Sequence, residues 1–126
     1  MLRIVDTCGW LEYIADTKNS KNFEQAILDT NNLIVPTIII YEVFKKICLD
    51  YCEDTALEVV AELKQGKVIE INETISIYAA KLSLEKKLPM ADALIYATGL
   101  LYKATIYTQD NHFENLSGVK YFTKVS

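Results

Sequence analysis

The stretch LPMADALIYATGLL, residues 88–101, decides how the rest of the chain is interpreted. Its spacing predicts an apolar helix that begins at Pro89, because the fixed φ of proline suits a first helical position, and that ends near Tyr102. One face of this helix carries residues at i, i+3, i+4, i+7 and i+8, namely Asp92, Ile95, Tyr96, Gly99 and Leu100. Asp92 therefore heads a face that should pack inward. A carboxylate there either complements the helix dipole or needs a separate partner.

The composition predicts one domain, residues 1–126, with a core of its own. The chain has 126 residues, of which 51% are hydrophobic, so it needs no disulfide or metal to hold it together. Its first residues lack the pattern of a secretory signal, and no apolar run approaches the roughly 20 residues that span a bilayer. Three cysteines cannot all pair within the chain and suit a reducing compartment. We therefore expect a cytoplasmic protein with no membrane segment.

Two further features of composition narrow the function. Cys48 and Cys52 stand one helical turn apart and could hold a soft metal, but the only histidine, His112, is distant in sequence, so packing is the favoured role. The formal charge is −4, which argues against binding nucleic acid by bulk electrostatics. A site that uses divalent cations, however, brings its own positive charge.

The alternation of short β-prone runs with helical spacings predicts an α/β fold. In residues 37–49 three consecutive isoleucines favour a strand, but length and apolar periodicity predict a helix with Ile40, Val43 and Ile47 on one face. Ser20 is expected to cap the helix before it. Strands are expected at 2–6, 33–35, 68–71, 104–108 and 119–122, with helices between them. Strands separated by helices imply right-handed crossovers. We therefore expect a three-layer α/β/α sandwich around a central, mostly parallel sheet of four to five strands.

Four acids stand either at the end of a predicted strand or at the edge of an apolar helix face. Asp6 and Asp110 each follow a strand, whereas Glu42 and Asp92 each stand at the edge of an apolar helix face. Singly, each has an ordinary explanation, such as a helix cap for Asp6 or a solvated edge for Glu42. In a parallel sheet, however, strand ends and the first turns of the following helices open at one edge. The four carboxylates could therefore converge there.

Converging carboxylates imply a cation. Without one they repel, and at least one stays protonated. Hard oxygen ligands around an open cleft suit Mg²⁺ or Mn²⁺, which also bind phosphate oxygens. The chemistry that this arrangement favours is metal-assisted hydrolysis of a phosphodiester bond.

The order and surroundings of these acids resemble those of the PIN-domain ribonucleases. In length and layout the chain is most similar to the VapC toxins of prokaryotic toxin–antitoxin pairs. The matching motifs cover essentially the whole chain and are VDTCGWLEY (5–13), TIIIYEVF (37–44), MADALIYATGL (90–100) and YTQDNHFENL (107–116). The resemblance implies a PIN-like fold, a metal-dependent endoribonuclease, an RNA substrate, a small antitoxin partner and a homodimer.

Carried over position by position, the resemblance implies that four residues are the catalytic, metal-binding acids: Asp6, Glu42, Asp92 and Asp110. Thr7 and Thr108 are then candidate hydroxyls that orient them. Where family members often have a further aspartate, this chain has His112. An imidazole there could ligate a metal or carry a proton, or it could be a solvated or capping side chain. Whether the chain has a second metal site therefore depends on whether His112 acts as a ligand.

Basic residues near the acids are sparse. The candidates for phosphate contacts are two adjacent pairs, which are equally well explained as solvated helix faces: Lys45 and Lys46, and Lys86 and Lys87. The single arginine, Arg3, leaves little for bidentate reading of bases.

Three alternatives compete with a toxin nuclease. The first is a PIN nuclease of RNA processing, which the absence of a short upstream reading frame would favour. The second is a catalytically silent PIN-like module that binds RNA or a protein, although such a module has no reason to keep four costly acids. The third is a phosphotransferase of the haloacid dehalogenase type. Such enzymes have a second aspartate two residues after the first, where this chain has Cys8, which argues against this alternative. No glycine-rich turn after the first strand supports a nucleotide-binding fold.

Overall fold

The centre of the molecule is a parallel sheet. The computed structural model describes residues 1–125. Its strands are β1 (Arg3–Val5), β2 (Ile34–Pro36), β3 (Lys67–Ile69), β4 (Thr105–Thr108) and β5 (Val119–Tyr121). β1, β4 and β5 form one group in the order β1-β4-β5, and β2 pairs with β3; every pairing is parallel. This confirms the predicted α/β class and the parallel sheet.

The two groups of strands meet at a single point. An isolated parallel bridge joins Arg3, at the start of β1, to Leu33, just before β2. Through this bridge the strands follow one another in the order β3-β2-β1-β4-β5. β1 therefore lies in the middle, and its carboxyl end opens beside that of β4.

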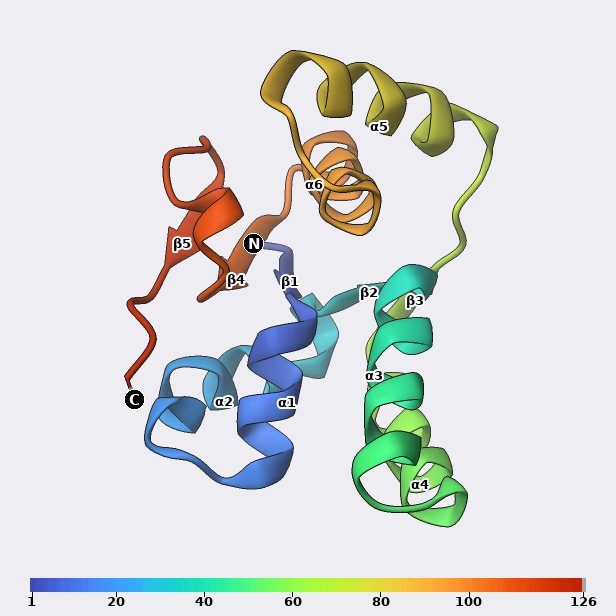
Figure 1. Cartoon of the computed structure of the whole chain (residues 1–126), viewed down its shortest axis with the longest axis vertical. Helices are drawn as coiled ribbons and strands as arrows, with labels where there is room; N and C mark the ends of the chain where they lie inside the picture. Colours follow the sequence, from blue (N-terminus) through green and yellow to red (C-terminus); the bar gives the residue numbers. More distant parts are fainter. Residues whose placement is uncertain (126) are drawn as a thin grey trace.

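Helices cover both faces of the sheet (Figure 1). They are α1 (Thr7–Ala15), α2 (Lys21–Leu28), α3 (Thr37–Asp50), α4 (Glu53–Leu63), α5 (Glu73–Lys86) and α6 (Met90–Tyr102), with short 3₁₀ turns at Lys18–Ser20, Thr30–Asn32 and Asn111–Phe113. α6 packs against β4, while α1 and α2 pack together and contact β4 and β1 respectively. α3 and α4 form a helical hairpin, and α5 lies along α6.

α6 is the predicted apolar helix, displaced by one residue at its start. Pro89 has an extended ψ of 156° and is the N-cap rather than the first helical residue, so the prediction that the helix begins at Pro89 was wrong by one position. The middle of α6 is buried nearly all round, including Ile95, Tyr96 and Gly99. A Cβ on Gly99 would lie 2.8 Å from Cδ1 of Ile106. The glycine therefore lets α6 approach β4 closely.

Two details of the local predictions need correction. Ser20, the predicted cap of α2, donates its hydroxyl to the Thr17 carbonyl at 2.7 Å and makes no capping hydrogen bond to the helix. Residues 37–49 form the predicted helix, and burial recurs along one face at Ile39, Val43 and Ile47. Ile39 takes the place on that face that the periodicity predicted for Ile40, which is only half-buried.

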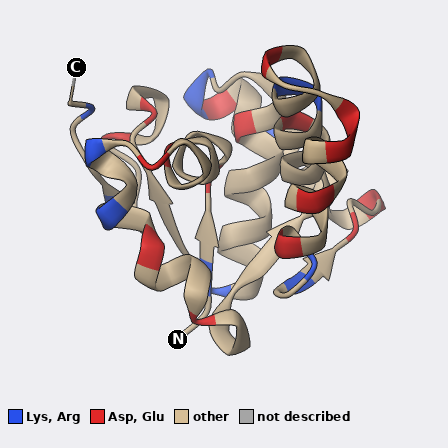
Figure 2. Ribbon diagram, turned by 90° about the horizontal axis from the view of Figure 1, so that it is seen from below, with Lys and Arg blue, Asp and Glu red and all other residues tan. Residues whose placement is uncertain are grey.

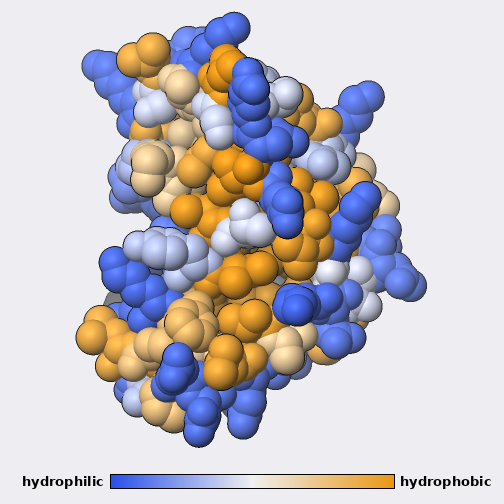
Figure 3. Space-filling model, turned by 90° about the vertical axis from the view of Figure 1, so that its right-hand side faces the viewer, coloured by the Kyte–Doolittle hydropathy of each residue, from blue (hydrophilic) through white to orange (hydrophobic). Residues whose placement is uncertain are grey.

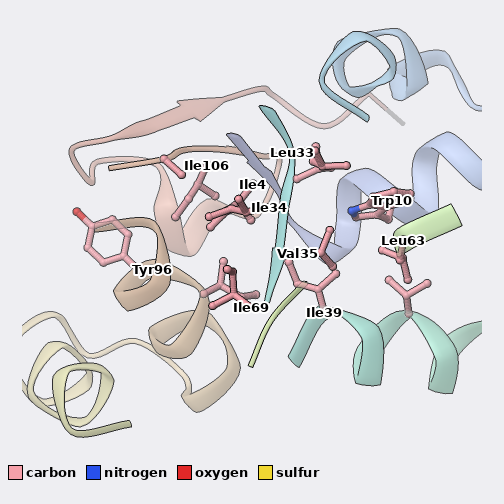
Figure 4. Packing of buried hydrophobic residues seen from close by; sticks show 14 of the residues in the cluster. Ile4, Trp10, Leu33, Ile34, Val35, Ile39, Leu63, Ile69, Tyr96 and Ile106 are labelled. Atoms are coloured by element: carbon pink, nitrogen blue, oxygen red, sulfur yellow. The ribbon is translucent and has the colours of Figure 1, made fainter. Parts of the chain in front are cut away.

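The core is continuous across both faces of the sheet (Figure 4). On the α6 side it includes Tyr96 and Ile106, and on the other side Trp10 and Leu63 contribute large buried groups. These side chains fix the helices whose first turns surround the carboxyl ends of the strands. None of the helices within residues 1–125 has the length and apolar character needed to cross a bilayer.

Candidate active site

Asp6 is the most firmly held carboxylate of the site. It follows β1, caps α1 and is 3% exposed. Its Oδ1 accepts the backbone N–H of Thr7 at 2.8 Å, and its Oδ2 accepts the hydroxyl of Thr108 at 2.8 Å. The hydroxyl of Thr108 in turn accepts the backbone N–H of Asp110 at 2.9 Å. The ends of β1 and β4 are therefore joined through one carboxylate.

The surroundings of Asp6 oppose its negative charge. Burial raises its pKa to about 6, and the charges of Asp110 and Glu42 add to this rise, although the hydrogen bonds from Thr108 and Thr7 lower it. Because a carboxylate with a raised pKa gains most from a nearby cation, Asp6 is suited to bind a positively charged ligand.

Glu42 reaches the site through a hydroxyl. It is half-buried on α3, and its Oε1 accepts the hydroxyl of Thr7 at 2.6 Å. Thr7 therefore contacts two of the four acids, by its backbone N–H to Asp6 and by its side chain to Glu42. This places Thr7 where the sequence predicted an orienting hydroxyl.

Asp92, Asp110 and His112 form a second group at the same edge of the sheet. Nδ1 of His112 lies 2.9 Å from Oδ2 of Asp92 and 2.9 Å from Oδ1 of Asp110. One ligand atom from each of the three residues fits within a span of 4.8 Å. The three side chains come from the first turn of α6 and from the turn after β4, so they are brought together by the fold and not by sequence spacing.

The electrostatics link the two groups of acids. Burial raises the pKa of Asp92 to about 7, and the charges of Asp110 and Asp6 raise it further. The neighbouring charge of Asp110 raises the pKa of His112. Since Asp110 and Glu42 also act on Asp6, each of the other three predicted acids lies within electrostatic reach of Asp6. Their negative charge is concentrated at one edge of the sheet.

Sequence reasoning missed two neighbours of the acids. Sγ of Cys8 lies 3.6 Å from Oδ2 of Asp6 and accepts the backbone N–H of Gln109 at 3.4 Å. The side chain of Gln109 donates to Glu12 at 3.0 Å and accepts from Asn19 at 2.5 Å. The only signal for them is position, since Cys8 is two residues after Asp6 and Gln109 lies between Thr108 and Asp110.

Within the described part of the chain, the predicted phosphate-binding lysines form no ion pair with the four acids. Lys46 forms an ion pair with Asp50 at 3.3 Å, and Nζ of Lys45 lies 5.7 Å from the centre of the Tyr41 ring. Lys86 ends α5 and Lys87 follows it, just before α6. In the view of Figure 2, basic and acidic residues are interspersed along the helices.

The donor set fits a divalent cation. Asp92 and Asp110 supply carboxylate oxygens, and His112 supplies a ring nitrogen, all close enough to share one ion. Asp6 adds a buried carboxylate whose charge is opposed by its surroundings. Oxygen and imidazole ligands around a partly open position suit Mg²⁺, Mn²⁺ and related ions.

Two sequence comparisons test the family of the chain. The family model of the PIN domain matches residues 3–119. A search of curated protein sequences gave no significant match.

Three solved structures share the fold at low sequence identity. A toxin–antitoxin complex from Klebsiella pneumoniae has 22% identity and a TM-score of 0.76, covering 94% of this chain and 95% of that one. The DNA-bound VapBC from Salmonella typhimurium has 17% identity and a TM-score of 0.77, covering 97% and 98%. VapC20 of Mycobacterium tuberculosis, a toxin that cleaves the sarcin–ricin loop, has 13% identity and a TM-score of 0.75, covering 90% and 94%.

Proposed function

Because the chain belongs to the PIN domain family, we propose that it is a metal-dependent endoribonuclease and the toxin of a VapBC-like toxin–antitoxin pair. The observation that carries this proposal is the convergence of buried and half-buried acids at one sheet edge, where Asp6 and Asp92 have raised pKa values. Carboxylates are retained in such a position when a cation stabilises them.

We assign the four acids the role of holding one or more Mg²⁺ or Mn²⁺ ions. Thr108 and the backbone of Thr7 each donate to one oxygen of Asp6, so this carboxylate is held in one orientation. The hydroxyl of Thr7 positions Glu42 in the same way. A bound ion would supply a Lewis acid for the phosphodiester and an activated water.

The RNA backbone would pass over this edge of the sheet. Lys86 and Lys87 directly precede the turn that leads to Asp92, and we assign them to phosphate contacts. Lys45 and Lys46 follow Glu42 by one helical turn and are assigned the same role. A few local lysines are enough where the metal ions carry most of the positive charge.

An antitoxin partner is supported by solved structures that share this fold. The structures from Klebsiella and Salmonella are a toxin–antitoxin complex and a VapBC complex.

The three cysteines of this chain are all free within residues 1–125. We place the protein in the cytoplasm, where such thiols stay reduced.

A homodimer is supported by an apolar side of the molecule. Figure 3 shows a band of hydrophobic residues across the side where α3, α4 and α5 lie. A groove of about 320 Å³ between α5 and α6 is lined mainly by small and apolar residues, among them Ile71, Ala79, Ala80 and Leu94. Exposed patches of this kind mark protein interfaces.

The decisive experiment removes single carboxylates without changing side-chain volume. We expect Asp6→Asn and Asp92→Asn to fold as the wild type does, to lose cleavage of total RNA in Mg²⁺ or Mn²⁺ by about 10²-fold or more, and to permit growth when expressed without an antitoxin. Circular dichroism and thermal unfolding check the fold, and mapping of cleaved ends identifies the target.

A matched control uses an acid outside the site. Glu58→Gln changes an exposed carboxylate on α4 and should leave cleavage unchanged. Equal cleavage by the wild type and both aspartate variants would contradict the catalytic assignment and would favour a silent RNA-binding or protein-binding module.

A further inference from the structure

His112 faces two of the partly buried acids at once. A single atom of its ring, Nδ1, lies 2.9 Å from a carboxylate oxygen of Asp92 and 2.9 Å from one of Asp110. Whether the imidazole is neutral or protonated, Nδ1 carries at most one N–H, so it cannot donate a full hydrogen bond to each of two carboxylates. A cation among the three groups would satisfy all of them.

The spacing of the three donor atoms suits one ion. Ligands on adjacent corners of an octahedron with bonds of about 2.1 Å lie about 3 Å apart. The distances from Nδ1 to the two carboxylate oxygens match this separation, and the whole set lies within 4.8 Å. Nδ1 of His112 therefore lies at the separation of an adjacent ligand from each of the two carboxylate oxygens.

The turn that carries His112 is fixed to the helix that carries Asp92. Phe113 is fully buried, and its ring meets that of Tyr96 on α6 edge to face, with the centres 6.3 Å apart. The backbone N–H of His112 also donates to Oδ1 of Asp110 at 2.9 Å. Although the imidazole itself is half-exposed, its backbone is held beside both acids.

The ring nitrogen changes which ion the site prefers. Mg²⁺ is a hard ion that takes oxygen ligands, whereas imidazole suits transition-metal ions. We propose that His112 is a protein ligand of the divalent ion held by Asp92 and Asp110, and that it gives this site a preference for Mn²⁺ over Mg²⁺. The use of that ion in RNA cleavage rests on the function proposed above, whereas its binding does not.

The first test measures metal binding to the full chain without RNA. The protein is prepared metal-free and without a histidine tag, and Mn²⁺ and Mg²⁺ are titrated separately by calorimetry into wild type, His112→Ala and His112→Asp. We expect His112→Ala to lower Mn²⁺ affinity at least about tenfold, because even outer-shell partners of metal ligands contribute that much. Mg²⁺ affinity should change less, and His112→Asp should narrow the ratio of the two affinities.

The second test detects the bond to nitrogen directly. His112 is the only histidine of the chain, so an imidazole nitrogen coupling in the pulsed EPR spectrum of the Mn²⁺-loaded protein can come from no other side chain. The coupling should be present in the wild type and absent from His112→Ala. An unchanged ratio of Mn²⁺ to Mg²⁺ affinity in His112→Ala, or a wild-type spectrum without imidazole nitrogen, would overturn the proposal.

The two proposals can fail separately. If Asp92→Asn cleaves RNA as the wild type does while the nitrogen coupling is present, the proposed nuclease site is wrong and the metal ligand stands. If cleavage is lost in Asp92→Asn but the wild type shows no coupling, the nuclease site stands and the role of His112 falls.

Discussion

At the scale of single residues, the site depends on carboxylates that the protein stabilises poorly when no cation is bound. Asp6 receives two hydrogen bonds that favour its charged form, yet burial outweighs them and raises its pKa to about 6. Asp92 has a pKa of about 7 for the same leading reason. Folding without metal therefore favours protonation of these two groups.

This predicts how stability depends on pH. Both pKa values are raised above those of the unfolded chain, so the stabilisation by protonation is complete below about pH 4 and is lost as the pH rises through 6 and 7. In EDTA, the melting temperature should fall between pH 5 and pH 8, and the fall should be smaller in Asp92→Asn. Thermal unfolding by circular dichroism measures both, and an equal fall in the two proteins would contradict the prediction.

Cysteine reactivity gives a second test at this scale. Burial raises the pKa of Cys8 to about 12, whereas hydrogen bonds from Thr55 lower the pKa of the exposed Cys52. Because the thiolate is the reactive form, iodoacetamide at pH 8 should modify Cys52 much faster than Cys8. Peptide mass spectrometry follows the two sites, and labelling in urea, where both should react, is the control. Similar rates in the folded protein would contradict the assignment of Cys8 to the buried site.

At the scale of elements, close packing of helices on the sheet positions the acids. Asp6 is the N-cap of α1, and a Cβ on Gly9 of this helix would lie 2.6 Å from Cδ1 of Phe23 and 2.7 Å from Cγ1 of Val5. On α6 the corresponding contact of Gly99 is with the end of the flexible Ile106 side chain. The two glycines therefore differ in how much their neighbours can move.

We expect Gly9→Ala to destabilise the protein by about 1–3 kcal/mol, the range of overpacking in a buried site. Gly99→Ala should cost less, because the end of the Ile106 side chain can shift; the preference of helices for alanine, about 1 kcal/mol over glycine, applies to both positions. Urea unfolding of both variants measures the difference. Gly9→Ala as stable as the wild type would show that α1 does not approach β1 and α2 as closely as described.

The same scale shows what the sequence could predict. Element order and the parallel sheet followed from apolar periodicity, and the positions of Asp6 and Asp110 followed from strands that end at an acid. Local rules failed where tertiary contacts decide, as at Ser20, whose hydroxyl bonds the preceding turn and not α2. The contact of His112 with Asp92 was beyond reach, because it depends on how the last turn packs against α6.

At the scale of the whole molecule, the apolar groove between α5 and α6 gives a test of the proposed dimer. Ala80 is exposed and lines the groove, whereas Leu28, on α2, is exposed and does not. Ala80→Glu should therefore give a monomer and Leu28→Glu a dimer in light scattering coupled to gel filtration. A monomeric wild type, or a dimer in both variants, would contradict an interface at this groove.

The β-bridge between Arg3 and Leu33 marks the boundary between the two groups of strands. It is the one β-bridge between the β1-β4-β5 group and the β2-β3 group within residues 1–125, and it lies at the amino ends of the strands, away from the acids. At the carboxyl ends, the hydroxyl of Thr7 reaches across the same boundary to Glu42. Because α3 follows β2 directly, Glu42 comes from the β2-β3 group, whereas Asp6 and Asp110 follow β1 and β4. The boundary between the two strand groups therefore passes through the site, and the hydrogen bond from Thr7 to Glu42 joins its two sides.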